Sequence, residues 1–181
     1  MAPSNDELTK VSTDGIPAPR PTENACDTNQ AQYIGASELV QTFYPALTSN
    51  RESIASFYAP TPSKILFNGN TVADGAAVQD IFVNQMPHAH YEVQSFDCQI
   101  INQGYPTMTA AGVKPPAQMT IKDMSILVSV SGFVRYGEGR DQPQRGFSET
   151  FVLVPNPTQS NDRGKRRRDW LIQSQNFRLV V

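Results

Sequence analysis

The sequence has little of what metal centres and membrane spans are made from. Its 181 residues include two cysteines, two histidines and one tryptophan. Cys26 and Cys98 have no neighbours at the spacing of zinc ligands. No run approaches the roughly 20 apolar residues of a transmembrane helix, and the first residues lack the apolar stretch of a secretory signal. We therefore expect neither a membrane protein nor a secreted one.

Motifs for nucleotide binding and nucleophilic catalysis are missing as well. The sequence contains no P-loop, no dinucleotide-binding glycine pattern and no nucleophile elbow. It also contains no Asn-X-Ser/Thr acceptor for glycosylation, and its two isolated cysteines are typical of proteins from reducing compartments. These absences predict a protein of the cytosol or nucleus that uses no cofactor.

Positive charge is concentrated in one short segment. The formal net charge is −2, yet five of the six residues in 163–168 are cationic. These five residues, here called the basic run, are Arg163, Lys165, Arg166, Arg167 and Arg168. Without them, ten basic residues stand against seventeen acidic ones, which leaves a net charge of −7 on the rest of the chain. Because an acidic body repels a phosphate backbone, any contact with nucleic acid must be local.

The chain begins with a polar segment and continues as a helix. Residues 1–27 are polar, punctuated by proline and without a periodic apolar face, which predicts a disordered leader. From Thr28 to Leu47, apolar residues recur at spacings of three and four, which predicts a helix of about five turns. A single domain over 28–181 is therefore expected.

Two further helices are expected before the sequence changes its period. Ser49 and Glu52 have the spacing of a capping box, which predicts that a short helix begins there and ends before Pro60. Asp74 is the predicted N-cap of a third helix that ends at Pro87. Between these two helices, the segment 63–75 reads as a small hairpin with Asn68-Gly69 as its turn.

The C-terminal half has the two-residue period of β-strands. Long strands are predicted at 91–101, 124–136, 147–154 and 170–181. The apolar phase slips inside the first and the last of these strands, which predicts β-bulges near 93–96 and 174–176. The order of the elements predicts an α+β fold, with three N-terminal helices packed on one face of a strongly bent antiparallel sheet.

Four segments in a fixed order resemble a known family. They are "VQSFDCQII", "ILVSVSGFVRYGEG", "RGFSETFVLVP" and "WLIQSQNFRLVV". Together with the three helices and the hairpin, they resemble the nuclear transport factor two-like family. Within it, they are similar to the small subunits of the heterodimeric messenger-RNA export receptor, of the fungal type. The resemblance is interrupted by an insertion at 102–122, containing Lys114, Pro115 and Pro116, and by the loop at 157–168, both expected to be mobile.

The resemblance implies a non-enzymatic adaptor that pairs with a related domain of a large subunit. It implies that Phe147, Phe151, Trp170 and Phe177 belong to the core of the fold. It also implies that the outward side of the last strand, with Asn176, Arg178 and Val180, forms the partner interface. An arginine there suits a carboxylate of the partner. Pore repeats rich in phenylalanine and glycine would be bound mainly by the large subunit, and the expected location is the nucleus and nuclear pore, with shuttling to the cytoplasm.

Several alternatives remain open from the residues alone. Arg178 also fits a solvated surface arginine. A homodimeric carrier for the GDP form of the Ran GTPase has the same expected fold, and so does a small dehydratase or isomerase. An enzyme of this type would draw on Asp97, Tyr91 and Tyr58, although tyrosines in such a fold are usually core residues. His88 and His90 have zinc-like spacing, but a polar surface turn after Pro87 is the preferred interpretation.

The basic run has three possible roles. It fits a solvated turn, an import signal, or a contact to RNA phosphates, because the last two both use dense local positive charge. No aromatic residues are interleaved with the cations. Any RNA contact is therefore expected to be directed at the backbone and independent of sequence.

Overall fold

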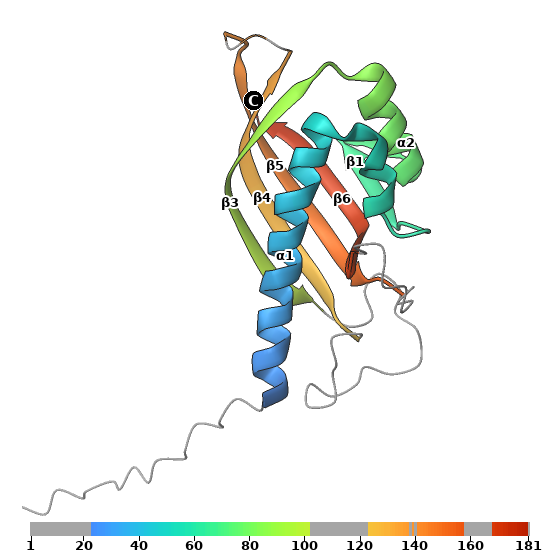
Figure 1. The fold of residues 1–181 in the computed structure, drawn as a ribbon, viewed down its shortest axis with the longest axis vertical. Coiled ribbons are helices and arrows are strands. Elements are labelled where there is room, and N and C mark those ends of the chain that lie inside the picture. The colour runs from blue at the N-terminus through green and yellow to red at the C-terminus, as the bar shows by residue number, and fades with distance from the viewer. Residues whose placement is uncertain (1–22, 102–122, 138, 140, 158–167, 181) are drawn as a thin grey trace, which may run out of the picture.

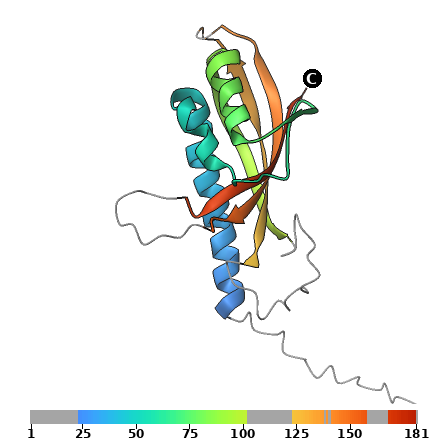
Figure 2. The ribbon, with the colours of Figure 1, turned by 90° about the vertical axis from the view of Figure 1, so that its right-hand side faces the viewer.

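The computed structural model describes residues 23–101, 123–137, 139, 141–157 and 168–180. Helices form one layer and a twisted, unclosed sheet forms the other (Figures 1 and 2). This arrangement confirms the α+β fold with helices on one face of a bent sheet. Most of the expected leader, the insertion at 102–122 and the larger part of the basic run lie outside the described residues.

The first helix, α1, is the longest and lies across the sheet. It spans Glu23–Ser49, so it begins five residues before the expected start at Thr28. Its apolar stripe packs against strands β3 (Ala89–Ile101) and β4 (Ser125–Tyr136) (Figure 1). Pro45 lies inside the helix, in its last turn and a half, where the backbone continues to Ser49.

The second helical segment differs from its prediction. It is a 3-10 helix, η1, at Arg51–Phe57, and its N-cap residue is Asn50. The expected capping box is wrong, because Ser49 still belongs to α1 and its hydroxyl donates to the carbonyl of Pro45 at 3.0 Å. A serine near the end of a helix often bonds to the carbonyl four residues earlier, and this one is therefore not available as a cap.

The third helix begins as predicted. Helix α2 spans Gly75–Asp80, and Oδ1 of its N-cap Asp74 accepts a hydrogen bond from the amide of Ala77 at 2.8 Å. The chain then widens into one π-helical turn, η2, at Ile81–Gln85. The predicted hairpin turn is also present: Asn68 and Gly69 both have positive φ, as a tight two-residue turn requires.

Six strands form the sheet in the order β2-β1-β6-β5-β4-β3. The four not yet described are β1 (Lys64–Phe67), β2 (Asn70–Val72), β5 (Gln144–Pro155) and β6 (Trp170–Val180). All pairs are antiparallel except one, since β1 runs parallel to β6. The sheet is therefore mixed rather than purely antiparallel. The hairpin signal in the sequence shows that β1 pairs with β2, but it does not show which long strand receives the hairpin.

Both expected bulges exist. Gln94 is the extra residue in β3, where the pairing with β4 shifts between Val93 and Ser95. In β6 the extra residue is Gln173, since Val152 pairs with Ser174 while Leu153 pairs with Ile172. This second bulge lies one residue before the range predicted from the apolar phase. Each bulge restores the inward orientation of apolar side chains after the phase slips.

The core lies between the helices and the sheet. Phe147, Phe151 and Phe177 are buried there, as predicted, and Trp170 is half-buried at its edge. Trp170 packs closely on α1 because residue 35 is glycine: a Cβ at Gly35 would lie 2.8 Å from the indole ring. Aromatic rings in edge-to-face contact, such as Phe43 with Phe151, fill the interior.

Candidate partner-docking face

The side chains of β6 alternate between two environments. Gln175 and Phe177 are buried beneath the helices, whereas Arg178 and Val180 are exposed on the other side of the sheet. Asn176 shares that outward side and is partly buried. The structure thus places the three predicted interface residues together on one face.

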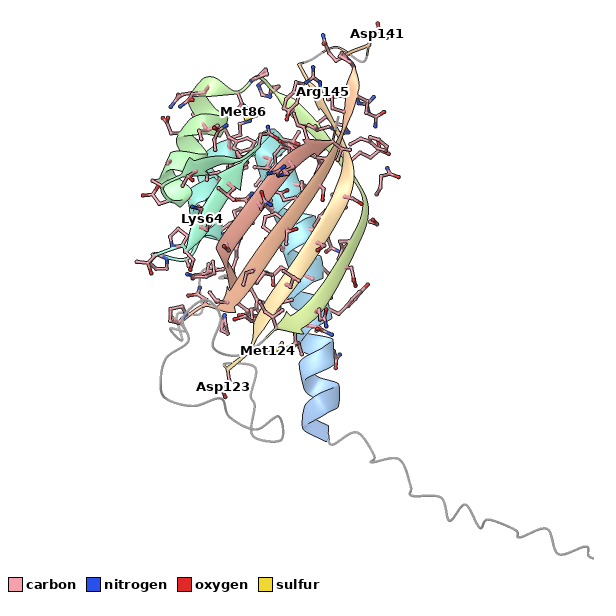
Figure 3. All side chains as sticks on the ribbon, turned by 180° about the vertical axis from the view of Figure 1, so that it is seen from behind. Lys64, Met86, Asp123, Met124, Asp141 and Arg145 are labelled. Carbon is pink, nitrogen blue, oxygen red and sulfur yellow. The ribbon has the colours of Figure 1, made fainter. Side chains whose placement is uncertain are left out.

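Strand register extends this face across the sheet. One lateral row consists of Ser95, Ser131, Ser148 and Arg178, and the next consists of Asp97, Ser129, Thr150 and Asn176. A third row brings together Glu92, Phe133, Gly146 and Val180. We call these twelve residues the docking face. Seen from behind, none of the described helices covers the face, and the ribbon of α1 lies on the far side of the sheet (Figure 3).

The middle of the docking face carries mainly small, polar side chains, and one end of it carries exposed apolar side chains. Ser95 and Ser131 share a hydrogen bond between their hydroxyl oxygens at 2.8 Å. In the third row, the side chains of Phe133 and Val180 are 41% and 58% exposed. Small hydroxyl residues leave the backbone of a second sheet room to approach, and exposed apolar side chains gain free energy when a partner covers them.

Two polar groups of the docking face lack partners within the described residues. Arg178 makes no hydrogen bond or ion pair there, in contrast to Arg135, which lies 3.9 Å from the carboxylate of Glu92. Oδ1 of Asn176 is buried and accepts no hydrogen bond in this part of the chain. Buried polar atoms are normally satisfied, and an unsatisfied one costs about 1–3 kcal/mol. A donor supplied from outside would remove that cost.

The inner side of the same strands holds a buried polar network centred on Glu149. Tyr44 donates its hydroxyl hydrogen to Oε2 of Glu149 at 2.6 Å, and Nε2 of Gln175 donates to Oε1 at 2.6 Å. Tyr58 in turn donates to Oε1 of Gln175. The carboxyl group is 1% exposed, and none of these hydrogen-bond partners carries a positive charge.

Burial dominates the titration of this network. It raises the pKa of Glu149 to about 7, although the hydrogen bonds from Tyr44 and Gln175 act in the opposite direction. The pKa values of Tyr44, Tyr58 and Tyr91 are raised well above 10, first by burial and then by nearby Glu149 or a neighbouring tyrosine. The tyrosines are therefore neutral donors at physiological pH. Sequence reasoning missed Glu149, although its position between Phe147 and Phe151 gives it the inward parity of β5.

The residues considered for catalysis do not come together. Tyr58 and Tyr91 are buried around Glu149, but Asp97 is exposed on the docking face, on the other side of the sheet. Its Oδ1 accepts a hydrogen bond from the amide of Cys98. The two tyrosines thus behave as core residues, and the sheet separates them from the aspartate.

The histidine pair shows no metal-binding cluster. His88 and His90 are exposed at the start of β3. Within the described residues, no group of three or more histidine, cysteine, aspartate or glutamate side chains is placed to hold a metal ion. The carbonyl of His88 accepts a hydrogen bond from the amide of Gly137, which extends the pairing of β3 with β4 by one residue. Among the helices the structure describes, none has the length and apolarity to cross a membrane.

Comparison with known proteins identifies the family. Residues 35–164 match the model of the nuclear transport factor 2 (NTF2) domain, which is most of the chain. The chain belongs to the NTF2 family. The family confirms the resemblance inferred from the order of the segments. It contains proteins that differ in function, so the fold alone does not assign one.

Individual relatives include export factors. The chain is 32% identical, over 101 residues, to NTF2-related export protein 1 of Schizosaccharomyces pombe, covering 56% of this chain and 70% of that protein. A chain in the complex of the Chaetomium thermophilum Mex67 NTF2-like domain with Mtr2 matches with a TM-score of 0.64 and 25% identity, over 83% of this chain and 99% of that one. A solved structure of Mtr2 matches with a TM-score of 0.59 and 23% identity, over the same shares.

Proposed function

We propose that this protein is a non-enzymatic adaptor, the small subunit of a heterodimeric export receptor of the Mex67:Mtr2 type. It would bind the NTF2-like domain of a large subunit through the docking face and help to carry messenger RNA through nuclear pores. In this role it acts in the nucleus and at the pore, and contact with phenylalanine-glycine repeats falls mainly to the large subunit. The 32% sequence identity to an export protein and the similarity of the fold to that of Mtr2 support the proposal.

The observation that carries the proposal is Arg178, which lies at the β6 end of the middle row of the docking face and has no partner within the described residues. The residue lies in a row of serines that are too short to shield it, and it has no acidic neighbour in its own row. A carboxylate from the partner would form two parallel hydrogen bonds with the guanidinium. Asn176 lies one row away and offers Oδ1 as an acceptor for a donor of the partner.

The enzymatic alternative is not supported by a matching observation. Glu149 is buried with both carboxyl oxygens hydrogen-bonded to protein, so a substrate would have to displace Tyr44 or Gln175 to reach it. A relative that is 32% identical is an export protein, and a chain with 25% identity belongs to a complex of the Mex67 NTF2-like domain with Mtr2. A homodimeric carrier of the same fold would use the same face, and the experiment below separates it from the heterodimer.

The decisive experiment reverses one charge. Arg178→Glu should weaken binding to the large subunit's NTF2-like domain by about 2–5 kcal/mol, because a carboxylate of the partner would face a like charge. This corresponds to a roughly 30- to 5,000-fold higher Kd by calorimetric titration. Arg145→Glu makes the same charge change at an exposed arginine of β5. Because the side chain of Arg145 lies on the inner side of the sheet, this control variant should bind the large subunit's domain with unchanged affinity.

Two results would contradict the proposal. An unchanged affinity of Arg178→Glu would exclude the role given to this residue. Failure of the wild-type chain to bind the NTF2-like domain, together with a stable homodimer, would favour the homodimeric carrier.

A further inference from the structure

Arg168, the last residue of the basic run, occupies a cleft on the helix side of the molecule. The cleft is lined by Gly35, Glu38, Leu39, Thr42, Phe57, Leu153 and Trp170. The guanidinium carbon lies 3.4 Å from the centre of the Phe57 ring. Nη1 donates a hydrogen bond to Oγ of Ser56 at 2.9 Å. A planar guanidinium over an aromatic face is a favourable contact that an ammonium group does not reproduce.

The electrostatic surroundings also suit a guanidinium. Burial lowers the pKa of Arg168, while the nearby carboxylate of Glu38 on α1 acts in the opposite direction and favours the charged form. The cleft therefore combines an aromatic plate, a hydroxyl acceptor and one acidic side chain. These are the elements with which proteins recognise an arginine side chain.

Hydrogen bonds fix the backbone around Arg168. The amide of Asn156 donates to the carbonyl of Asp169 at 2.8 Å, and Nδ2 of Asn156 donates to the carbonyl of Arg168 at 2.9 Å. Asn156 follows β5 and Arg168 precedes β6, so these bonds join the two ends of the segment that carries the other cations. The position of Arg168 is thus part of the fold, unlike that of a solvated turn residue.

The fit of Arg168 in the cleft is incomplete. Its Nε is buried without an acceptor within the described residues. About 10 Å³ of the cleft remains unfilled, which is roughly the space of a single water molecule. An unsatisfied buried donor weakens the seating of the side chain, since it loses water without gaining a partner. The cleft can therefore release Arg168 more readily than a fully paired site would.

We propose that this cleft is an arginine-binding site that is occupied in cis by Arg168, which can be released from it. When Arg168 leaves, an arginine side chain from another protein segment takes the same place over Phe57. The cleft is lined mainly by residues of α1 and η1. These helices lie on the side of the sheet opposite the docking face, so both sites can be occupied together (Figure 2). The proposal does not depend on the export role.

Chemical rescue tests the proposal. Arg168→Ala empties the cleft and should lower the melting temperature. N-acetyl-L-arginine methylamide should then raise it again and shift the NMR signal of the Trp170 indole. Millimolar concentrations are needed, because a tethered side chain has an effective concentration of that order. N-acetyl-L-lysine methylamide should have no comparable effect, and wild-type protein should respond to neither compound because its site is filled.

Three variants complete the test. Arg145→Ala removes an exposed arginine elsewhere and should not create a response to the arginine analogue. Adding Phe57→Leu to Arg168→Ala should abolish the response, since the stacking surface is lost. If Arg168→Ala does not fold, Arg168→Lys carries the same test, because lysine keeps the charge but not the planar stack. The proposal is overturned if the empty cleft shows no response, or the same response to the arginine and lysine analogues.

Discussion

Phe147 and Phe133 lie in neighbouring positions on adjacent strands, yet they belong to opposite faces of the sheet. Phe133 pairs with Gly146, and Phe147 pairs with Gly132. Phe147 is 1% exposed and packs against Tyr44 and Tyr91, whereas Phe133 is 41% exposed on the docking face. Among the described residues, helices cover the inner face and the buried Glu149 is hydrogen-bonded there, while no described helix covers the docking face and its Arg178 is unpaired.

The two faces serve different properties: the inner face stabilises the fold, and the outer face is available to a partner. Burial of apolar surface contributes about 25 cal/mol per Å², so the free energy of folding comes mainly from the inner face. The outer face contributes little to folding, but it retains apolar and charged groups that a partner can cover. A residue's contribution to either property can therefore be read from its parity along the strand.

The pair of phenylalanines gives the largest expected contrast. Phe147→Ala should lower the free energy of unfolding by about 3–5 kcal/mol, because it leaves a cavity in the packed core. Phe133→Ala should change it by no more than about 0.5 kcal/mol, since the ring is exposed. Chemical denaturation measures both. Equal losses for the two variants would mean that the outer face is already covered in the isolated chain.

Glu149 predicts a pH dependence that belongs to the inner face alone. Its pKa is 4.5 in an unfolded chain and about 7 in the folded protein. Between these values the folded state binds more protons, so the free energy of unfolding falls as pH rises from about 4.5 to 7. A shift of this size corresponds to a loss of about 3 kcal/mol, complete above pH 7.

The variant Glu149→Gln isolates this effect. Glutamine is neutral, its oxygen can accept from Gln175, and its amide can donate to the hydroxyl oxygen of Tyr44. Its stability should therefore be nearly independent of pH between 4.5 and 8, and should exceed that of the wild type at pH 8. Denaturation curves at four pH values suffice. If the free energy of unfolding changed with pH in the same way for the variant and the wild type, Glu149 would not titrate in this range.

The basic run gives the smallest expected effect on folding. Replacing Lys165, Arg166 and Arg167 with serine should change stability by no more than about 0.5 kcal/mol each. Arg168 must be retained, because it stacks on Phe57 and its loss would add a folding defect. If the run contacts RNA phosphates, the slope of log affinity against log salt should flatten by about 0.7 per lost contact.

The triple serine variant also distinguishes the other two possible roles of the basic run, an import signal and a solvated turn. Arg163 is retained in it as a control. Unchanged RNA affinity combined with failed nuclear entry would identify an import signal. If neither property changes, the run is a solvated turn.

Much of the fold could be predicted from the sequence because the relevant signals are local. Apolar spacing located the helices and strands, Asn68-Gly69 marked the hairpin, and Asp74 marked a helix start. Apolar phase slips located both bulges to within one residue. The parallel pairing of β1 with β6 could not be predicted, since it depends on where the chain re-enters the sheet after η1.

The candidate site was predictable only in part. Parity alone placed Arg178 opposite Phe177, and the structure confirms this orientation. The rows of serines across four strands required the register, which no local signal provides. Arg168 was grouped with solvated cations because its stacking partner Phe57 lies more than one hundred residues away in the sequence. Contacts of this type follow from the tertiary structure rather than from a motif.

The central claim is that the partner binds the outer face of the sheet, and methyl cross-saturation NMR on the heterodimer tests it most directly. The isotope-labelled chain is combined with the unlabelled NTF2-like domain of the large subunit, whose protons are saturated. The account predicts signal loss at the methyl groups of the docking face, above all those of Val180, which is 58% exposed. Methyl groups on the helix side, such as those of exposed Ile34 and Val83, should keep their intensity. Loss at Ile34 and Val83, with Val180 unaffected, would contradict the account.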